Sequence, residues 1–306
     1  MDTLTSIEFF VTTVQAGSFA AGAKRLGVTA SAVSRRIARL EDELGVQLLA
    51  RTTRSLRLTE DGAAFLDRGA RIVEEYRAAT EALKGTRTVP AGALRVDSAV
   101  VLGRSLLRPK IPDFLRRYPK IRLELTLRDQ YIDPVAEGID VAVRLGELRD
   151  SALVARRLGE VRTLICGSPA YFRRHGRPRR IEDLARHARL GFLQDGRPTP
   201  YRFVDGKVPP APAVEARFHT NDADLLLDGA IAGLGLVYSF DFHVEGALAR
   251  GELEAAPLCD PSLMYPVHAL YPKSRHLMPR ARVFVDFLVE LFEARRKEAK
   301  RARRAP

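Results

Sequence analysis

The amino-acid sequence predicts an α+β protein, with a small helical N-terminal unit and a larger α/β unit built as two lobes. Apolar residues first recur at helical spacing, in several segments before residue 84. From 93 to 292, short strand-like runs alternate with helical segments, which is the pattern of a largely parallel sheet covered by helices. This alternation occurs in two successive blocks, and we therefore expect two lobes.

The N-terminal unit is expected to hold two short helices at a sharp turn, above a first helix over 5–15. Ser18 is a favourable N-cap for the first short helix, and Gly27 ends it. Thr29 caps the second, which runs to Leu44 before Gly45 ends it. One face of this second helix is apolar and should be buried; it carries Val33, Ile37, Leu40 and Leu44.

The opposite face of the second short helix suits the major groove of DNA. Short side chains allow a close approach, and Arg35 can reach a guanine edge or a phosphate. The acidic run 41–43 would be repelled by phosphates, so we expect the N-terminal end to enter the groove. An amphipathic helix with a solvated basic face is the alternative. The predicted DNA contacts on this helix are Thr29, Ala30, Ser31, Ser34, Arg35, Arg36 and Arg39.

A basic hairpin is expected directly after this helix. Residues 56–58 alternate between apolar and polar, as in a short half-buried strand. The segment 24–57 holds 8 Lys and Arg against 3 Asp and Glu, a local charge of +5. Such a charge is the footprint of a DNA surface. We therefore expect Arg51 and Arg54 to clamp phosphates rather than read the sequence.

Residues 59–84 predict a long helix with a seam for a partner helix. The seam is spaced as the a and d positions of a heptad repeat, which favours dimerisation. A helix buried within one chain is the alternative. The seam residues are Phe65, Gly69, Ile72, Tyr76, Ala79 and Leu83.

Composition limits the class of protein. The chain has 306 residues, 46% hydrophobic and 29% charged, as in globular proteins. No apolar run reaches the length of a membrane span, and the first residues do not form a signal peptide, so we expect a cytoplasmic location. Cys166 and Cys259 are too few for a disulfide framework; redox sensing is the alternative use.

The positive charge is spread along the chain. Of the net charge of +12, residues 1–89 contribute +2 and residues 293–306 contribute +5. The basic tail could attract phosphates nonspecifically, or it could be a solvated helix end.

A small-molecule effector is expected at the carboxyl ends of strands in the larger unit, where open α/β sheets bind ligands. Helix N-termini there suit an anion, which makes a carboxylate-bearing or aromatic effector the hypothesis. Ser98 and Asn221 could instead serve only as helix caps. The candidate effector contacts are Ser98, Val100, Arg144, Asn221 and Tyr238.

No catalytic signature is found in the sequence. The chain lacks His-Glu-x-x-His, a Walker Gly-Lys-Ser/Thr and Gly-x-Ser-x-Gly, and its 6 histidines have no metal-ligand spacing. We expect no catalytic residue, metal or cofactor other than the effector. Two further classes stay open: an enzyme fused to a DNA-binding domain, and a DNA-compacting protein without ligand response.

Several motifs together resemble one family. In the N-terminal part they are Gly17-Ser18-Phe19, Val33-Ser34-Arg35, Leu40-Glu41, Leu44-Gly45 and Leu58-Thr59-Glu60-Asp61-Gly62. Further on they are Leu94-Arg95-Val96, Tyr118-Pro119, residues 137–146, Ser168-Pro169-Ala170-Tyr171 and Gly233-Leu234-Gly235. This pattern resembles that of LysR-type transcriptional regulators.

The resemblance implies a winged helix-turn-helix and an effector domain similar to periplasmic solute-binding proteins. The expected divisions are a DNA-binding domain over 1–58, a linker over 59–92, an effector domain over 93–292 and a tail over 293–306. Lobe I would comprise about 93–165 and 267–292, and lobe II about 166–266. The resemblance also implies double-stranded DNA, RNA polymerase and an effector as partners, in a homodimer or homotetramer. Many relatives differ at Ala30-Ser31, so the operator must be measured.

Overall fold

The structure is a computed structural model that describes residues 3–50, 56–83, 89–130, 132–148, 153–199, 201, 218–258, 264–273 and 277–302. The chain divides into two compact units, residues 1–89 and 90–306. Each unit has its own hydrophobic core. No described helix is long and apolar enough to cross a membrane.

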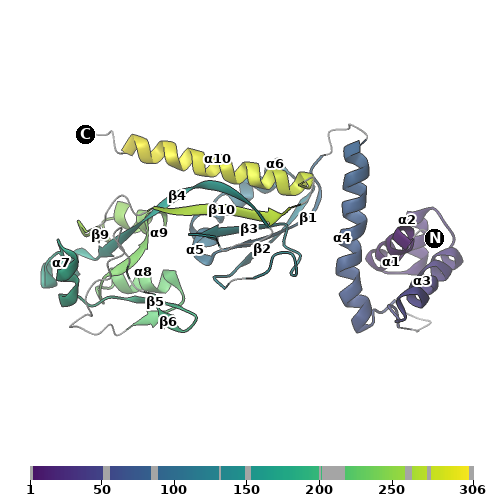
Figure 1. The fold of residues 1–306 in the computed structure, drawn as a ribbon, viewed down its shortest axis with the longest axis horizontal. Coiled ribbons are helices and arrows are strands. Elements are labelled where there is room, and N and C mark those ends of the chain that lie inside the picture. Colours follow the sequence, from purple (N-terminus) through teal and green to yellow (C-terminus); the bar gives the residue numbers. More distant parts are fainter. Residues whose placement is uncertain are drawn as a thin grey trace. The chain divides into compact units, whose positions relative to one another are not determined.

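In the described residues of the first unit, four helices are present: α1 (Thr3–Ala16), α2 (Phe19–Leu26), α3 (Ala30–Leu44) and α4 (Glu60–Leu83) (Figure 1). The expected caps are confirmed, since Ser18 and Thr29 accept backbone hydrogen bonds and Gly27 and Gly45 are left-handed. Three residues of the apolar face of α3 are buried: Val33, Ile37 and Leu40. Leu44 is 41% exposed, so its predicted burial was wrong. It is the last residue of α3, and periodicity does not show where the covering core ends.

The start of α4 is joined tightly to the segment after α3. The Thr59 hydroxyl donates to the Gln47 carbonyl at 2.6 Å and accepts from the Gly62 amide at 2.9 Å. A Cβ on Gly62 would lie 1.9 Å from the Leu48 carbonyl oxygen, so only glycine permits this approach. Further along α4, Gly69 gives the same kind of access to Ile7 of α1.

The second unit is built on a seven-stranded sheet with the order β2-β1-β3-β10-β4-β8, in which β9 also pairs with β4. The strands are β1 (Gly92–Ser98), β2 (Ile121–Leu127), β3 (Val141–Leu145), β4 (Leu153–Gly167), β8 (Val237–Phe240), β9 (Glu254–Ala255) and β10 (Met264–Pro272). Only the pairs of β1 with β2 and with β3 are parallel in this sheet. The expectation of a largely parallel sheet was therefore wrong, because the long strands β4 and β10 pair antiparallel.

The described residues also form a small three-stranded sheet, β6-β5-β7. It comprises β5 (Gly191–Gln194), β6 (Arg197–Pro198) and β7 (His219–Thr220). The helices of this unit are α5 (Val100–Leu102), the π-helix η1 (Gly103–Leu107), α6 (Ile111–Arg117), α7 (Pro169–His175), the 3-10 helix η2 (Ile181–Arg186), α8 (Ala223–Ile231), α9 (Asp241–Ala249) and α10 (Pro279–Ala302). Two of the strand-like runs that the sequence shows between 93 and 292, at 201–204 and 214–219, lie mostly outside the described residues.

The second unit has two lobes that share β4. The first half of β4 pairs with β10 in lobe I, with one bulge where Val267 pairs with Gly159 and His268 with Arg157. The second half, from Thr163, pairs with β8 and β9 in lobe II. The two lobes have separate apolar clusters, with Phe284 central in one and Val237 in the other.

Helix α10 runs across lobe I toward lobe II (Figure 1). Phe292 packs on Gly159 of β4, where a Cβ would lie 3.0 Å from its ring. One turn later, Arg295 forms ion pairs with Asp241 at 3.1 Å and Glu245 at 3.0 Å, both on α9. The helix therefore braces lobe I and lobe II together.

Candidate DNA-reading surface and interlobe site

The surface of α3 has an exposed polar side above a buried apolar one. Residues 29–31, Ser34, Arg35 and Arg39 are exposed. Within the described part of the chain, the guanidinium groups of Arg35 and Arg39 form no hydrogen bond or ion pair. The Thr29 hydroxyl lies 3.1 Å from that of Ser31 and accepts from the Ala32 amide at 3.3 Å. These positions hold donors and acceptors at the N-terminal end of an accessible helix.

Two charged residues of α3 have structural contacts. The guanidinium of Arg36 lies 5.7 Å from the ring centroid of Phe9 on α1, so this side chain is held against the protein. Glu41 turns its carboxylate toward the chain after the helix, where it accepts from the backbone amides of Leu48 at 2.8 Å and Leu49 at 2.9 Å. Glu41 is therefore part of the structure of the hairpin, which the sequence interpretation of an acidic run missed.

The base of the expected wing is present. Leu49 and Leu58 form an antiparallel bridge, and the Ala50 amide donates to the Arg57 carbonyl at 2.8 Å. Arg51 and Arg54, the predicted phosphate clamp, lie outside the described residues.

The predicted dimerisation seam on α4 divides into two sets. Phe65 packs against Phe10 with ring centroids 5.8 Å apart, and Gly69 contacts α1. These two positions therefore serve the core of their own chain, unlike the single seam that the sequence predicts. Ile72 and Tyr76 are exposed, at 45% and 55%. The side chains of Ala79 and Leu83 lie outside the described part of the structure.

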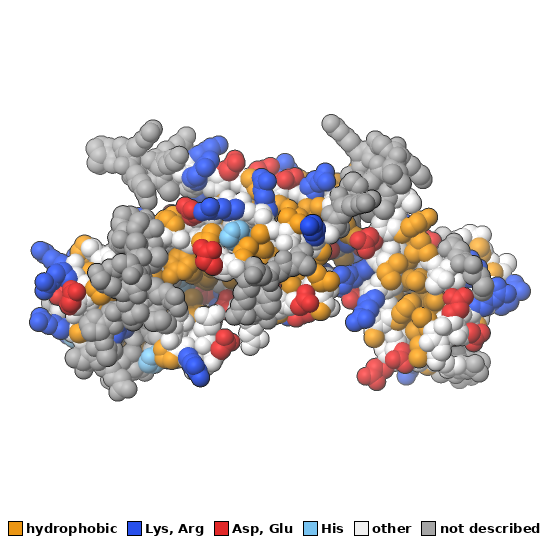
Figure 2. All heavy atoms as spheres, viewed as in Figure 1, with side chains coloured by type: hydrophobic (Ala, Val, Ile, Leu, Met, Phe, Trp, Pro, Cys, Tyr) orange, Lys and Arg blue, Asp and Glu red, His pale blue; other side chains and the backbone are white. Residues whose placement is uncertain are grey.

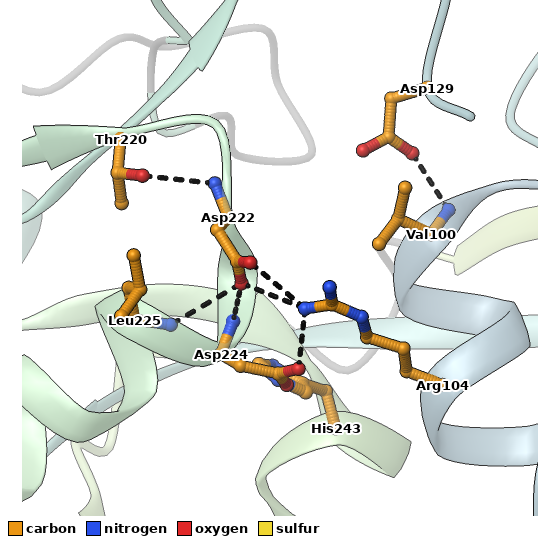
Figure 3. A network of polar contacts seen from close by, with 8 residues as sticks. All are labelled: Val100, Arg104, Asp129, Thr220, Asp222, Asp224, Leu225 and His243. Atoms are coloured by element: carbon orange, nitrogen blue, oxygen red, sulfur yellow. Dashed lines mark hydrogen bonds and ion pairs between the residues drawn. The ribbon is translucent and has the colours of Figure 1, made fainter. Parts of the chain in front are cut away.

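In the second unit, Arg104 links η1 of lobe I to the start of α8 in lobe II (Figure 3). Arg104 of η1 donates from Nη1 to the carboxylate oxygens of Asp222 at 3.1 and 2.9 Å, and to Asp224 at 2.9 Å. The carboxylates raise the pKa of Arg104. Burial acts to raise the pKa of Asp222, but the hydrogen bonds from Arg104 and from the α8 amides outweigh it, and this pKa lies below its ordinary value. We call Arg104, Asp222 and Asp224 the interlobe site.

A second set of hydrogen bonds supports the interlobe site from lobe II. His243 Nε2 lies 3.0 Å from Asp224 Oδ1, and its Nδ1 lies 2.8 Å from the Ser239 hydroxyl. These three residue types are those of a catalytic triad. Ser239 is only 8% exposed, however, and Asp224 is shared with Arg104. The arrangement therefore favours positioning of Asp224 over nucleophilic chemistry.

Three predicted effector residues have partners within the protein. The Ser98 hydroxyl is buried and donates to the Ala99 carbonyl at 3.2 Å. The Val100 amide, expected to face an anion, donates to Asp129 at 3.0 Å (Figure 3). Arg144 forms an ion pair with the fully buried Asp97.

The other two predicted effector residues lie in lobe II. Asn221 is exposed, and the N-cap of α8 is its neighbour Asp222, which accepts from the Asp224 and Leu225 amides. The Tyr238 hydroxyl accepts from Thr163 at 2.9 Å, and its ring stacks on Tyr201 at 4.9 Å. Of the three residues of the interlobe site, only Asp222 carried a local sequence signal, because Asp is a favoured cap type. The contacts of Arg104 join residues 118 and 120 apart, which no local pattern indicates.

Comparison with known proteins decides the family. Residues 4–63 match the model of bacterial regulatory helix-turn-helix proteins of the lysR family, and residues 87–293 match that of the LysR substrate binding domain. The chain belongs to the LysR family of transcriptional regulators. It is thus a DNA-binding regulator with a substrate-binding effector domain, as the motifs predict.

Relatives of this LysR-type regulator are similar over nearly its whole length. The transcriptional regulator CrgA of Neisseria meningitidis is 39% identical over 284 residues, covering 92% of this chain and 94% of the relative. The transcriptional activator AaeR of Escherichia coli is 31% identical over 299 residues, covering 95% and 94%. A transcriptional repressor of Pseudomonas aeruginosa is 35% identical over 294 residues, covering 95% and 93%.

Solved structures of LysR-type regulators share the fold. The structure of CrgA has a TM-score of 0.61 at 37% identity and covers 94% of this chain and 98% of that chain. The full-length virulence activator AphB of Vibrio cholerae has a TM-score of 0.56 at 26% identity and covers 94% and 98%. Both comparisons span the N-terminal and the effector units.

Proposed function

We propose that α3 is the helix by which this LysR-type regulator reads its operator, with its N-terminal end in the major groove. The observation that carries the proposal is the contrast on α3. Val33, Ile37 and Leu40 are buried, whereas Arg35 and Arg39 are exposed and have no partner among the described residues. Small side chains at Ala30, Ser31 and Ser34 allow the approach that base contacts need. Arg36 can contact DNA only if its guanidinium moves away from the ring of Phe9.

The test of the reading helix compares two kinds of arginine. Arg35→Ala should reduce the preference for an operator fragment over random DNA by about 1–3 kcal/mol, as for a lost base contact. Arg51→Ala, in the wing expected from the sequence, should weaken binding to both DNAs about equally and lower the salt dependence. Operator preference that survives Arg35→Ala unchanged would show that another surface reads the sequence. The operator fragment would first be selected from genomic DNA that the full-length protein retains.

We propose that the effector binds beside Arg104. In this proposal Arg104, and not Arg144, is the positively charged side chain that pairs with an anionic effector. All three hydrogen bonds of Arg104 leave from Nη1, so Nη2 and Nε have no partner in the described part of the chain. Two adjacent donors of a guanidinium match a carboxylate in bidentate geometry. Asp222 and Asp224 hold the side chain so that these donors stay oriented. The proposed effector is therefore a carboxylic acid, whose remaining part is either aromatic or aliphatic.

Calorimetry on the full-length protein tests this assignment. A panel of organic acids would be titrated together with the matching methyl esters, which lack the charge. We expect one or more acids to bind, their esters to fail, and Arg104→Gln to abolish the signal. Arg108→Gln removes a neighbouring exposed charge and should leave binding intact. Acid binding that Arg104→Gln does not affect would contradict the proposal.

Assembly and location complete the proposal. Paired half-sites in DNA are read by paired proteins, so a homodimer, or a homotetramer of two dimers, fits the function. The exposed Ile72 and Tyr76 of α4 are the proposed contact. The proposed domains are 1–58, 59–92, 93–292 and the tail 293–306. We further propose regulation through RNA polymerase in the cytoplasm, without enzymatic activity.

A further inference from the structure

Lobe II carries a dense set of arginines on α7, on η2 and on the segment between them. Arg173, Arg174, Arg179 and Arg186 are all exposed, and we call these four the α7–η2 patch. Their guanidinium groups form no ion pair or hydrogen bond with any residue that the structure describes. Basic side chains gather over this end of lobe II at the left of Figure 2.

Elsewhere in the same unit, most arginines have a carboxylate. Ion pairs of this kind include Arg95 with Glu124, Arg117 with Glu290, Arg128 with Glu137, Arg157 with Glu160 and Arg250 with Glu252. Within the patch, Asp183 is engaged instead by the backbone amides of Arg179 and Arg180, at 2.9 Å each. These hydrogen bonds lower the pKa of Asp183. The charges of Arg180 and Arg186 also lower this pKa, so Asp183 offsets part of the charge of Arg186. The like charges of the patch still raise the energy of the folded protein, so an external anion would be stabilised here.

The patch lies on an ordered frame. Ser168 caps α7 through the Tyr171 amide at 3.3 Å, and the Tyr171 hydroxyl lies 3.2 Å from His187 and accepts from the Ala188 amide at 3.1 Å. Leu184 of η2 is fully buried. The backbone positions of the arginines are thus fixed before a partner arrives, which reduces the entropy lost on binding.

The residue type points to phosphate. The patch consists of arginines alone, and a guanidinium can bind a phosphate through two parallel hydrogen bonds. Exposed arginines that follow one another on α7, the next segment and η2 suit a repeating anion such as the DNA backbone. We infer that the α7–η2 patch is a second phosphate-binding surface, by which the effector domain contacts duplex DNA outside the segment read by α3. This contact adds affinity and salt dependence without sequence preference.

The salt dependence of DNA binding tests the inference on the full-length protein. The probe is a random-sequence duplex, in a short form of about two helical turns and a long form of about six. In the patch variant, Arg173, Arg174, Arg179 and Arg186 are changed to Gln. In the control variant, four exposed arginines of the same unit that have no described partner, Arg108, Arg122, Arg156 and Arg282, are changed to Gln. Both variants lose the same net charge.

On the long duplex, the patch variant should lower the slope of log K against log salt by about 2–4, because each lost phosphate contact removes about 0.9. The control variant should keep the wild-type slope, and exchanging the patch arginines for Lys should restore it. On the short duplex, the slopes of log K against log salt should differ less between the wild type and the patch variant. An unchanged slope in the patch variant, or an equal fall in the control, would overturn the inference. Thermal unfolding should be the same for all variants, since surface changes of this kind have small effects.

Discussion

Arg104 donates two hydrogen bonds to the carboxylate of Asp222, at 3.1 and 2.9 Å, and thereby ties η1 of lobe I to the first turn of α8 in lobe II. Asp222 also caps α8 through the amides of Asp224 and Leu225. One carboxylate therefore holds both a helix end and the opposite lobe. A ligand that paired with Arg104, as proposed, would act on the contact between the lobes and could thereby favour one arrangement over another.

The charge on Asp222 should make the free energy of unfolding depend on pH in the acid range. Its pKa in the folded protein lies below the ordinary value, so its stabilisation is complete above about pH 4 and is lost as pH falls through the folded pKa. Asp222→Asn keeps a favourable N-cap but removes the charge. Urea unfolding should show wild type more stable than Asp222→Asn at neutral pH, with the difference shrinking below about pH 4. A difference that persists unchanged in acid would argue against the ion pair.

Glu41 should contribute more to the stability of the N-terminal unit than its acidic neighbours Asp42 and Glu43. Its removal leaves the Leu48 and Leu49 amides without their acceptor, at a cost of about 1–3 kcal/mol for each group that stays buried. We expect Glu41→Ala to lower the unfolding free energy of the N-terminal unit and to weaken DNA binding. Glu43→Ala, on an exposed side chain, removes the same charge and should have little effect on stability. Equal stability of the two variants would refute this role.

The contact between Gly62 and Leu48 should tolerate no side chain. Gly62→Ala places a Cβ 1.9 Å from the Leu48 carbonyl oxygen, so we expect a loss of about 3 kcal/mol or more, at the upper end of overpacking. Gly45→Ala is the comparison, because a Cβ there meets open space and only the positive φ is strained, at roughly 1–2 kcal/mol. Chemical denaturation of both variants measures this order. A milder effect at Gly62 than at Gly45 would disprove it.

Self-association should depend on α4. Ile72→Ser combined with Tyr76→Ser removes the large apolar side chains that are exposed on the described part of this helix, and it should shift the protein to smaller species in analytical ultracentrifugation. The matched control is Leu44→Ser combined with Val46→Ser, which removes exposed apolar side chains of the same unit, at 41% and 40% exposure, from another place. If both pairs had the same effect, α4 would not be the specific contact.

Local sequence patterns predicted local structure well. The caps at Ser18 and Thr29, the glycines that end α2 and α3, and the buried face through Leu40 all follow from neighbouring residues, and the structure confirms them. The family was predicted for the same reason, since its motifs are continuous in sequence. The DNA contacts themselves remain predictions.

What the sequence did not show depends on distant contacts. Heptad spacing placed Gly69 and Ile72 on one seam, but a periodic pattern does not say which residues α1 covers. Arg144 was predicted to contact an effector because its buried partner, Asp97, is 47 residues away in the sequence. Arg104 had no visible role for the same reason. The sheet was wrongly predicted to be largely parallel because β10 returns from lobe II and pairs antiparallel between β3 and β4.

The partner change along β4 has a consequence for insertions and deletions. From Thr163 onward both sides of the strand are covered, with Leu164 and Cys166 in one apolar cluster and Ile165 in another. Inserting a single residue at Arg162 would exchange these sides and direct each side chain into the wrong cluster. Inserting two residues would restore the alternation while moving lobe II along the strand. Between the bulge beside Gly159 and the start of the lobe II pairing at Thr163, the chain can therefore change in length only by an even number of residues if each side chain is to keep its cluster.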